Sequence, residues 1–209
     1  MSNRTRTSVS RIRLPREERR QQLLDVTKRI VGEDGLHVVS IDRVAREAGI
    51  TRPIVYGHFT DLPGLLRALL EREGVRALRQ ITALMPPPAS GDDDVIEVLM
   101  AALTGFLEAV RAEPVTWRLV LMPPEGAPAS VRDGIQQARA AITSQLAELI
   151  EQSYEPYGGQ RSPDPLLTAS SMTAIADHWA RLLLTEPETF DLERILVHGR
   201  WAIERFAPR

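Results

Sequence analysis

The chain of 209 residues contains no cysteine, and only 5% of its residues are aromatic. The lack of cysteine excludes a disulfide framework, a cysteine-ligated zinc site and a thiol nucleophile. No run approaches ~18 consecutive apolar residues, so the sequence predicts no membrane-spanning helix. The basic N-terminal residues are not followed by an apolar core, so we expect no secretory signal and a cytoplasmic protein.

Short motifs of the common enzyme classes are also missing. There is no Gly-x-Ser-x-Gly, no His-Glu-x-x-His and no phosphate-binding glycine loop. The four histidines, His37, His58, His178 and His198, are isolated, so they give no metal-ligand spacing. We therefore expect no catalytic site, no metal site and no cofactor.

Charge is unevenly distributed along the chain. Residues 1–60 contain 12 Lys/Arg and 7 Asp/Glu, a net charge of +5, whereas residues 81–209 contain 10 and 18, a net charge of −8. This asymmetry favours contact of the N-terminal part with a polyanion, although a basic tail that is merely solvated would give the same counts. The first aromatic residue is Tyr56, so the basic segment has no ring on which unpaired bases could stack. Double-stranded DNA is favoured over single strands.

Apolar residues near the N-terminus recur at helical spacing. A first helix is expected over 15–34, with Pro15 in its first turn and Gly35 as its stop. Ser40 can cap a second, short helix that ends at Gly49, and Thr51 can cap a third. Two short helices joined by a tight turn predict a helix-turn-helix, although a helical hairpin without nucleic acid would share the pattern.

Helical patterns continue through the rest of the chain, punctuated by proline. We expect helices over 61–85, 93–112, 114–122, 128–153, 164–185 and 190–206, and few strand-like runs. The predicted fold is all-α. A three-helix DNA-binding domain with a basic arm covers residues 1–60, and a larger helical domain covers residues 61–209.

Between Gly35 and Phe59 the sequence contains Ser-Ile at 40–41, Val-Ala at 44–45, Ala-Gly-Ile-Thr at 48–51 and Tyr-Gly-His-Phe at 56–59. In the order and spacing of these motifs, the segment resembles the TetR (tetracycline-repressor-like) family of transcriptional regulators. The resemblance covers residues 16–60, and the remainder matches only in the number and length of helices. Leu62 stands where the family often has a lysine resembling a phosphate contact. The arginines of the basic arm, Arg4, Arg6, Arg11 and Arg13, are candidates to replace that charge.

The second helix of a helix-turn-helix places its N-terminal residues in the major groove. Arg52 is the candidate base reader, because a guanidinium can bond guanine O6 and N7 together, although a phosphate contact is the alternative. Thr51 is a candidate phosphate contact or a simple cap. Ile54 is a candidate contact to a thymine methyl group or a core residue.

Four further residues complete the predicted DNA contacts. Tyr56 and His58 resemble the family's phosphate-contacting pair. Gly57 between them either lets the backbone approach DNA closely or removes a contact that a larger side chain would make. Arg43, near the start of the second helix, is a candidate phosphate contact.

For the larger domain, the resemblance implies dimerisation through the last two helices. Small residues between Ala169 and Ala180 allow close helix approach, and an apolar stripe on the last helix is wide enough to pack on a partner; internal packing is the alternative. The stripe comprises Leu192, Ile195, Leu196, Gly199, Ala202, Ile203 and Phe206. Candidate residues for a ligand cavity, each of which could instead be ordinary core, are Phe106, Trp117, Met122, Met172, His178 and Trp179, with Asp177 as a polar neighbour.

Together these features predict a ligand-responsive transcriptional regulator that binds a pseudo-palindromic operator as a homodimer. We expect a repressor that a small-molecule effector releases from DNA, although the sequence does not decide between repression and activation or identify the effector. The alternative is a degenerate helix-turn-helix protein that acts through a protein partner or binds DNA without sequence specificity.

Overall fold

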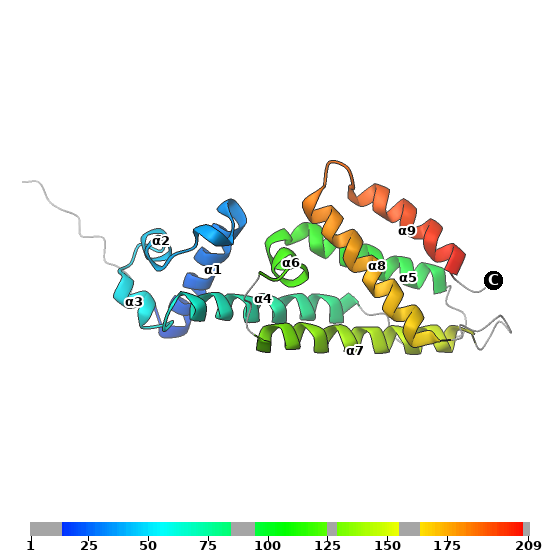
Figure 1. Ribbon diagram of the computed structural model, residues 1–209, viewed down its shortest axis with the longest axis horizontal. Helices are drawn as coiled ribbons and strands as arrows, with labels where there is room; N and C mark the ends of the chain where they lie inside the picture. Colours follow the sequence, from blue (N-terminus) through cyan, green and yellow to red (C-terminus); the bar gives the residue numbers. More distant parts are fainter. Residues whose placement is uncertain (1–13, 85–94, 125–128, 155–163, 207–209) are drawn as a thin grey trace, which may run out of the picture. The chain divides into compact units, whose positions relative to one another are not determined.

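A computed structural model describes residues 14–84, 95–124, 129–154 and 164–206 of the chain (Figure 1). Within these ranges the regular structure is helical and contains no strand, which confirms the all-α prediction. None of the helices in this part of the chain combines the length and hydrophobicity needed to cross a bilayer. The chain divides into two compact units, and the boundary lies between Leu66 and Arg67. The arginines of the predicted basic arm lie outside the described residues.

The first unit is built from short helices around one long one. It contains α1 (Arg16–Asp34), the 3₁₀ helix η1 (Leu36–Val38), α2 (Ile41–Glu47), α3 (Arg52–Tyr56) and the start of α4 (Leu62–Leu84). Gly35 ends α1 with a φ of 89°, a left-handed conformation that favours glycine. The Asp61 carboxylate caps α4 by accepting a hydrogen bond from the Gly64 N–H at 2.7 Å.

Two elements of this unit differ from the sequence-based expectation. The third helix, which was expected to follow Thr51, covers only five residues and ends before Gly57. Pro53 occupies its first turn, and the backbone N–H of Gly57 already closes onto the Pro53 carbonyl at 3.0 Å. The 3₁₀ helix η1 was not expected, because three residues give no recognisable periodicity.

The second unit contains the rest of α4 and, within the described residues, five further helices. These are α5 (Val95–Ala112), α6 (Pro114–Leu121), α7 (Ala129–Tyr154), α8 (Pro165–Thr185) and α9 (Leu192–Phe206). α8 packs against α7, and α9 packs against α5 (Figure 1). The Asp164 side chain caps α8 by accepting from the Leu167 N–H at 2.9 Å.

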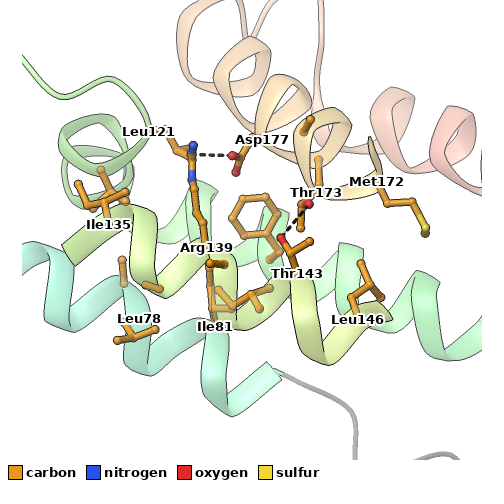
Figure 2. A pocket seen from close by; sticks show the side chains of 18 of the residues that line it. Leu78, Ile81, Leu121, Ile135, Arg139, Thr143, Leu146, Met172, Thr173 and Asp177 are labelled. Carbon is orange, nitrogen blue, oxygen red and sulfur yellow. Dashed lines mark hydrogen bonds and ion pairs between the residues drawn. The ribbon is translucent and has the colours of Figure 1, made fainter. Parts of the chain in front are cut away.

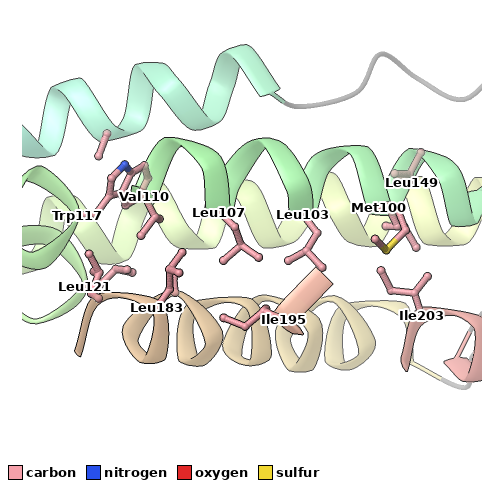
Figure 3. Packing of buried hydrophobic residues seen from close by; sticks show 14 residues of the cluster. Met100, Leu103, Leu107, Val110, Trp117, Leu121, Leu149, Leu183, Ile195 and Ile203 are labelled. Atoms are coloured by element: carbon pink, nitrogen blue, oxygen red, sulfur yellow. The ribbon is translucent and has the colours of Figure 1, made fainter. Parts of the chain in front are cut away.

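The core of the second unit lies between α5 and the helices that cover it. Met100, Leu103, Leu107 and Val110 repeat at i, i+3 and i+4 along α5 and belong to one buried cluster with Leu183 of α8 (Figure 3). From α9, the cluster receives Ile195 and Ile203, with Leu192 and Leu196 packed beside it. The structure therefore corrects one prediction: most of the apolar stripe of the last helix packs within the chain rather than on a partner. An amphipathic helix needs only one apolar face, and here its own core uses that face. The side chain of Phe206 lies outside the described residues.

Candidate functional site

Hydrogen bonds of the backbone and of the Ser40 side chain fix where the helices of the helix-turn-helix begin and end. Ser40 is the N-cap of α2, where its hydroxyl accepts from the Arg43 N–H at 3.2 Å. The chain turns at Gly49, whose φ is 67°, and the Ile50 N–H then bonds the Ala45 carbonyl at 3.0 Å. Thr51 is the N-cap of α3, but its side chain makes no capping hydrogen bond.

Burial fixes which side of α3 faces solvent. Val55 is fully buried, together with Val44 of α2 and Ile30 of α1. On the other side of α3, Ile54 is 42% exposed and Tyr56 is 53% exposed. Exposed apolar and aromatic side chains on so short a helix have no role in the core, so this face is available for contact with a ligand such as DNA.

Arg52 begins α3 on this exposed surface. Its Nη2 donates a hydrogen bond of 2.5 Å to Oδ2 of Asp42 in α2, and its Nε pairs with Oδ1 of the same carboxylate. The two side chains are 63% and 53% exposed. The predicted base reader is therefore solvent-accessible and is held at one edge by an acidic neighbour.

Arg43, a predicted phosphate contact, lies in a different environment. Its Nε bonds Glu47 at 2.9 Å and its Nη2 bonds Asp34, while Arg29 bonds the other oxygen of Glu47 at 3.2 Å. Hydrogen bonds to Glu47 and Asp34 raise the pKa of Arg43, and the bond from Arg43 lowers the pKa of Glu47. Two carboxylates thus already engage this guanidinium, and its role at DNA stays a prediction.

The segment after α3 is covered by arginines of α1. The guanidinium of Arg20 donates to the His58 carbonyl at 3.2 Å and lies 4.6 Å from the centre of the Phe59 ring. Burial, and then the charges of Arg16, Arg20 and Arg19, lower the pKa of His58. The prediction missed this arginine group, although its i, i+3, i+4 spacing on α1 was visible in the sequence.

Gly57, between Tyr56 and His58, has an ordinary helical φ of −68°. The backbone conformation therefore does not require glycine. A Cβ at this position would lie 3.3 Å from the Ile54 carbonyl oxygen, which is a tight contact. Local packing therefore favours the absence of a side chain here.

The second unit contains a cavity of about 970 Å³, lined by residues of α4 to α9. Of the predicted ligand residues, Phe106, Trp117, Met172 and Trp179 line it, and so does Asp177. Met122 and His178 do not: Met122 packs against the core cluster, and His178 is exposed on α8. His178 lies on an exposed side of α8, and Met122 follows the last residue of α6; sequence spacing alone resolved neither placement.

Most of the lining is aliphatic or aromatic, and two polar pairs interrupt it (Figure 2). Arg139 of α7 reaches Asp177 of α8 at 2.6 Å, and the hydroxyls of Thr143 and Thr173 lie 3.3 Å apart. Burial raises the pKa of Asp177, while the charges of Arg139 and Arg181 oppose that rise. The contribution of α7 was not predicted, because a helix gives no sequence signal for which cavity it borders.

Exposed apolar side chains gather on the last two helices. Leu166 and Leu167 at the start of α8 are 55% and 63% exposed, and Val197 and Trp201 on α9 are 68% and 54% exposed. Val197 and Trp201 are four residues apart and share one face of α9. This face is separate from the stripe that packs into the core.

The helix-turn-helix and the helical second unit define a DNA-binding transcriptional regulator, and the comparisons with known proteins agree. Residues 23–69 match the model of the bacterial regulatory proteins of the tetR family. The HTH-type transcriptional activator FasR of Mycolicibacterium smegmatis is 28% identical over 186 residues, which cover 86% of this chain and 78% of that protein.

Solved structures give the same result for the fold. A TetR-family regulator from Rhodococcus sp. matches with a TM-score of 0.66 and 26% identity, covering 90% of this chain and 97% of that one. A transcriptional regulator from Saccharomonospora viridis, solved in complex with choline, matches with a TM-score of 0.72 and 22% identity over 92% and 99% of the two chains. Residues 23–69 therefore carry the DNA-binding segment of the TetR family of transcriptional regulators, and the chain as described shares the fold of a TetR-family regulator.

Proposed function

We propose that this protein is a homodimeric repressor that leaves its operator when a small molecule occupies the cavity of the second unit. The observation that carries the proposal is the pairing of an exposed α3 face in one unit with a large apolar cavity in the other. Ligand cavities are mostly apolar with a few polar groups that orient the ligand, and Arg139, Asp177 and the two threonines fit that description.

Dimerisation is supported by the exposed apolar residues of α8 and α9. A single helix-turn-helix gives little affinity, whereas two copies can read half-sites about 34–36 Å apart. A homodimer with two-fold symmetry would therefore bind a pseudo-palindromic operator.

Arg52, Ile54, Tyr56 and His58 are the proposed DNA contacts of α3 and the segment that follows it. Thr51, Gly57 and Arg43 complete the proposed surface. The exposure of Ile54, Tyr56 and Arg52 supports this assignment. Leu62, at the start of α4, supplies no charge there, so we expect arginines elsewhere in the first unit to contribute to phosphate binding.

α4 is the proposed link between effector and DNA, because the chain passes from the first unit to the second within this helix. Its residues Leu78 and Ile81 line the cavity (Figure 2). An effector releases the operator only if it binds the DNA-incompatible state more tightly than the DNA-bound state.

The effector is proposed to be a largely apolar small molecule with few polar groups. The S. viridis neighbour was solved with choline, which supports a small-molecule ligand in this fold without identifying the one used here. Its similarity to this chain concerns the fold alone.

An activator is the second candidate, because the relative from M. smegmatis is named a transcriptional activator. Transcription of a reporter gene placed behind a DNA segment that the protein binds distinguishes a repressor from an activator. A repressor lowers expression of the reporter, and an activator raises it.

The test of the proposal is a mobility shift with the upstream region of the protein's own gene at two salt concentrations. Retardation that the unlabelled upstream region competes away, but an unrelated duplex does not, supports operator binding. Retardation that does not depend on the DNA sequence, or no retardation, contradicts it. A thermal-shift screen then supplies cavity ligands, which should release the DNA. Ala138→Trp, which fills the cavity, should abolish release, and Gln137→Trp, outside the lining, should not.

A further inference from the structure

We propose that Asp42 is a specificity-determining residue, which holds the Arg52 guanidinium so that its free edge meets a guanine base of double-stranded DNA. The inference rests on the proposed function, in which α3 reads the major groove. It assigns a role to a residue of α2 that does not itself have to contact DNA.

The argument begins with the donors of the guanidinium. Arginine has five N–H donors in a planar fork. Oδ1 and Oδ2 of Asp42 pair with Nε and Nη2 of Arg52, which is the side edge of the fork. The end edge, formed by Nη1 and the second hydrogen of Nη2, keeps two parallel donors. Guanine offers two acceptors, O6 and N7, on its major-groove edge, and no other base presents that pair.

The Arg52–Asp42 pair lies on the exposed surface of the first unit, where it can meet DNA, and not in the hydrophobic core. Both side chains are more than half exposed, so burial does not hold them together. Ile54 and Tyr56 are exposed on the same short helix. Arg43 provides the contrast, because Glu47 and Asp34 engage its side edge and its Nη2 from two directions and only 22% of its side chain is exposed.

Asp42 should raise specificity at the expense of total affinity. An arginine without a partner can swing to any nearby phosphate, which positions the protein but reads no sequence. The Asp42 carboxylate repels phosphates and holds the guanidinium in one orientation, so it disfavours that alternative. Removing its charge should therefore lower the preference for guanine while strengthening binding to unrelated DNA. A merely structural residue would weaken both together.

The experiment selects duplexes with randomised half-sites on the full-length protein and sequences the bound fraction. Wild type, Asp42→Asn, Arg52→Ala and the control Asp34→Asn are compared, after circular dichroism has shown that each folds. Asp34 is the matched control because it likewise pairs with an arginine, Arg43 of α2, which is not the proposed base reader.

We expect wild type to prefer guanine at one half-site position and Arg52→Ala to lose that preference. Asp42→Asn should reduce the preference by about two- to tenfold, the worth of one hydrogen bond, and raise affinity for a scrambled duplex. Asp34→Asn should keep the wild-type preference.

Two results overturn the inference. The first is an unchanged guanine preference in Asp42→Asn while Arg52→Ala abolishes it, which would leave the proposed function intact. The second is an equal loss of affinity for selected and scrambled duplexes in Asp42→Asn, which would give Asp42 only a structural role. If Arg52→Ala changes nothing at any position, reading of DNA by α3 fails as well, so the two failures are distinguishable.

Discussion

Replacing Thr116 by valine removes a hydroxyl that donates to a buried carboxylate in the second unit. Glu73 of α4 is 0% exposed, and its Oε2 accepts from Thr116 of α6 at 2.6 Å. Its Oε1 accepts from Nε of Arg72 at 3.0 Å. Thr116 Oγ1 also lies 3.1 Å from Oε2 of Glu113, but its single proton can serve only one carboxylate, and the Glu73 contact is the shorter. This bond joins α4 to α6, which contributes Trp117 to the cavity wall.

A hydrogen bond to a charged group contributes about 1.5–3 kcal/mol. Valine has the shape of threonine, so its substitution removes the bond without leaving a cavity. For a chain of this length, each 1 kcal/mol lowers Tm by about 2–4 °C. We therefore expect Thr116→Val to lower Tm by about 3–12 °C.

The assay is thermal unfolding followed by circular dichroism, with two controls. Thr116→Ser keeps the hydroxyl and should retain most of the stability. Thr82→Val removes an exposed hydroxyl that bonds the Leu78 carbonyl at 2.9 Å, and should change stability by less than about 0.5 kcal/mol. The reasoning is refuted if Thr116→Val unfolds within 1 °C of wild type, or if Glu73→Gln leaves the effect of Thr116→Val unchanged in a double-mutant cycle.

Three further predictions concern the DNA contact, the packing of α9 and the dimer. In the free protein, burial and then Arg16, Arg20 and Arg19 lower the pKa of His58, against a smaller opposing effect of Glu17, and contact with a phosphate should raise it. DNA affinity should therefore rise as pH falls through the pKa of the bound state and level off below the pKa of the free state. His58→Gln should remove this pH dependence in fluorescence anisotropy titrations, and an unchanged pH profile in the variant would exclude the contact. Gly199→Val should cost about 1–3 kcal/mol in urea unfolding, because even a Cβ there would lie 2.7 Å from Leu103 Cδ2 and 3.4 Å from Trp179; stability equal to wild type would contradict this packing of α9. Val197→Glu combined with Trp201→Glu should produce monomers in sedimentation experiments, whereas Val75→Glu, at a similarly exposed site on α4, should not; a dimer that survives the double change would place the interface elsewhere.

Local signals account for most of the fold that the sequence predicted. Gly35, Ser40, Gly49 and Asp61 start or stop helices through their own backbone conformation or side chain, so their effect is visible in a few neighbouring residues. The length of α3 was harder to predict, because a helix between Pro53 and Gly57 has little more than one turn and so shows no clear periodicity.

Long-range packing accounts for most of what the sequence did not predict. An apolar stripe such as that of α9 shows that a helix buries one face, but not whether the neighbour is its own chain or a second copy. The pairing of Arg139 with Asp177 joins residues far apart in the sequence and depends on how α7 meets α8. Arg20 likewise meets His58 only once α1 has folded beside the segment after α3.

The central claim is that the exposed face of α3 enters the major groove of operator DNA. The most direct test is a competition titration of wild type and of Arg52→Ala combined with Tyr56→Ala, using a duplex selected by the wild-type protein. We predict that the double variant folds normally and binds this duplex at least about 30-fold more weakly, since two contacts of about 1 kcal/mol each are lost. Binding within twofold of wild type would contradict the account.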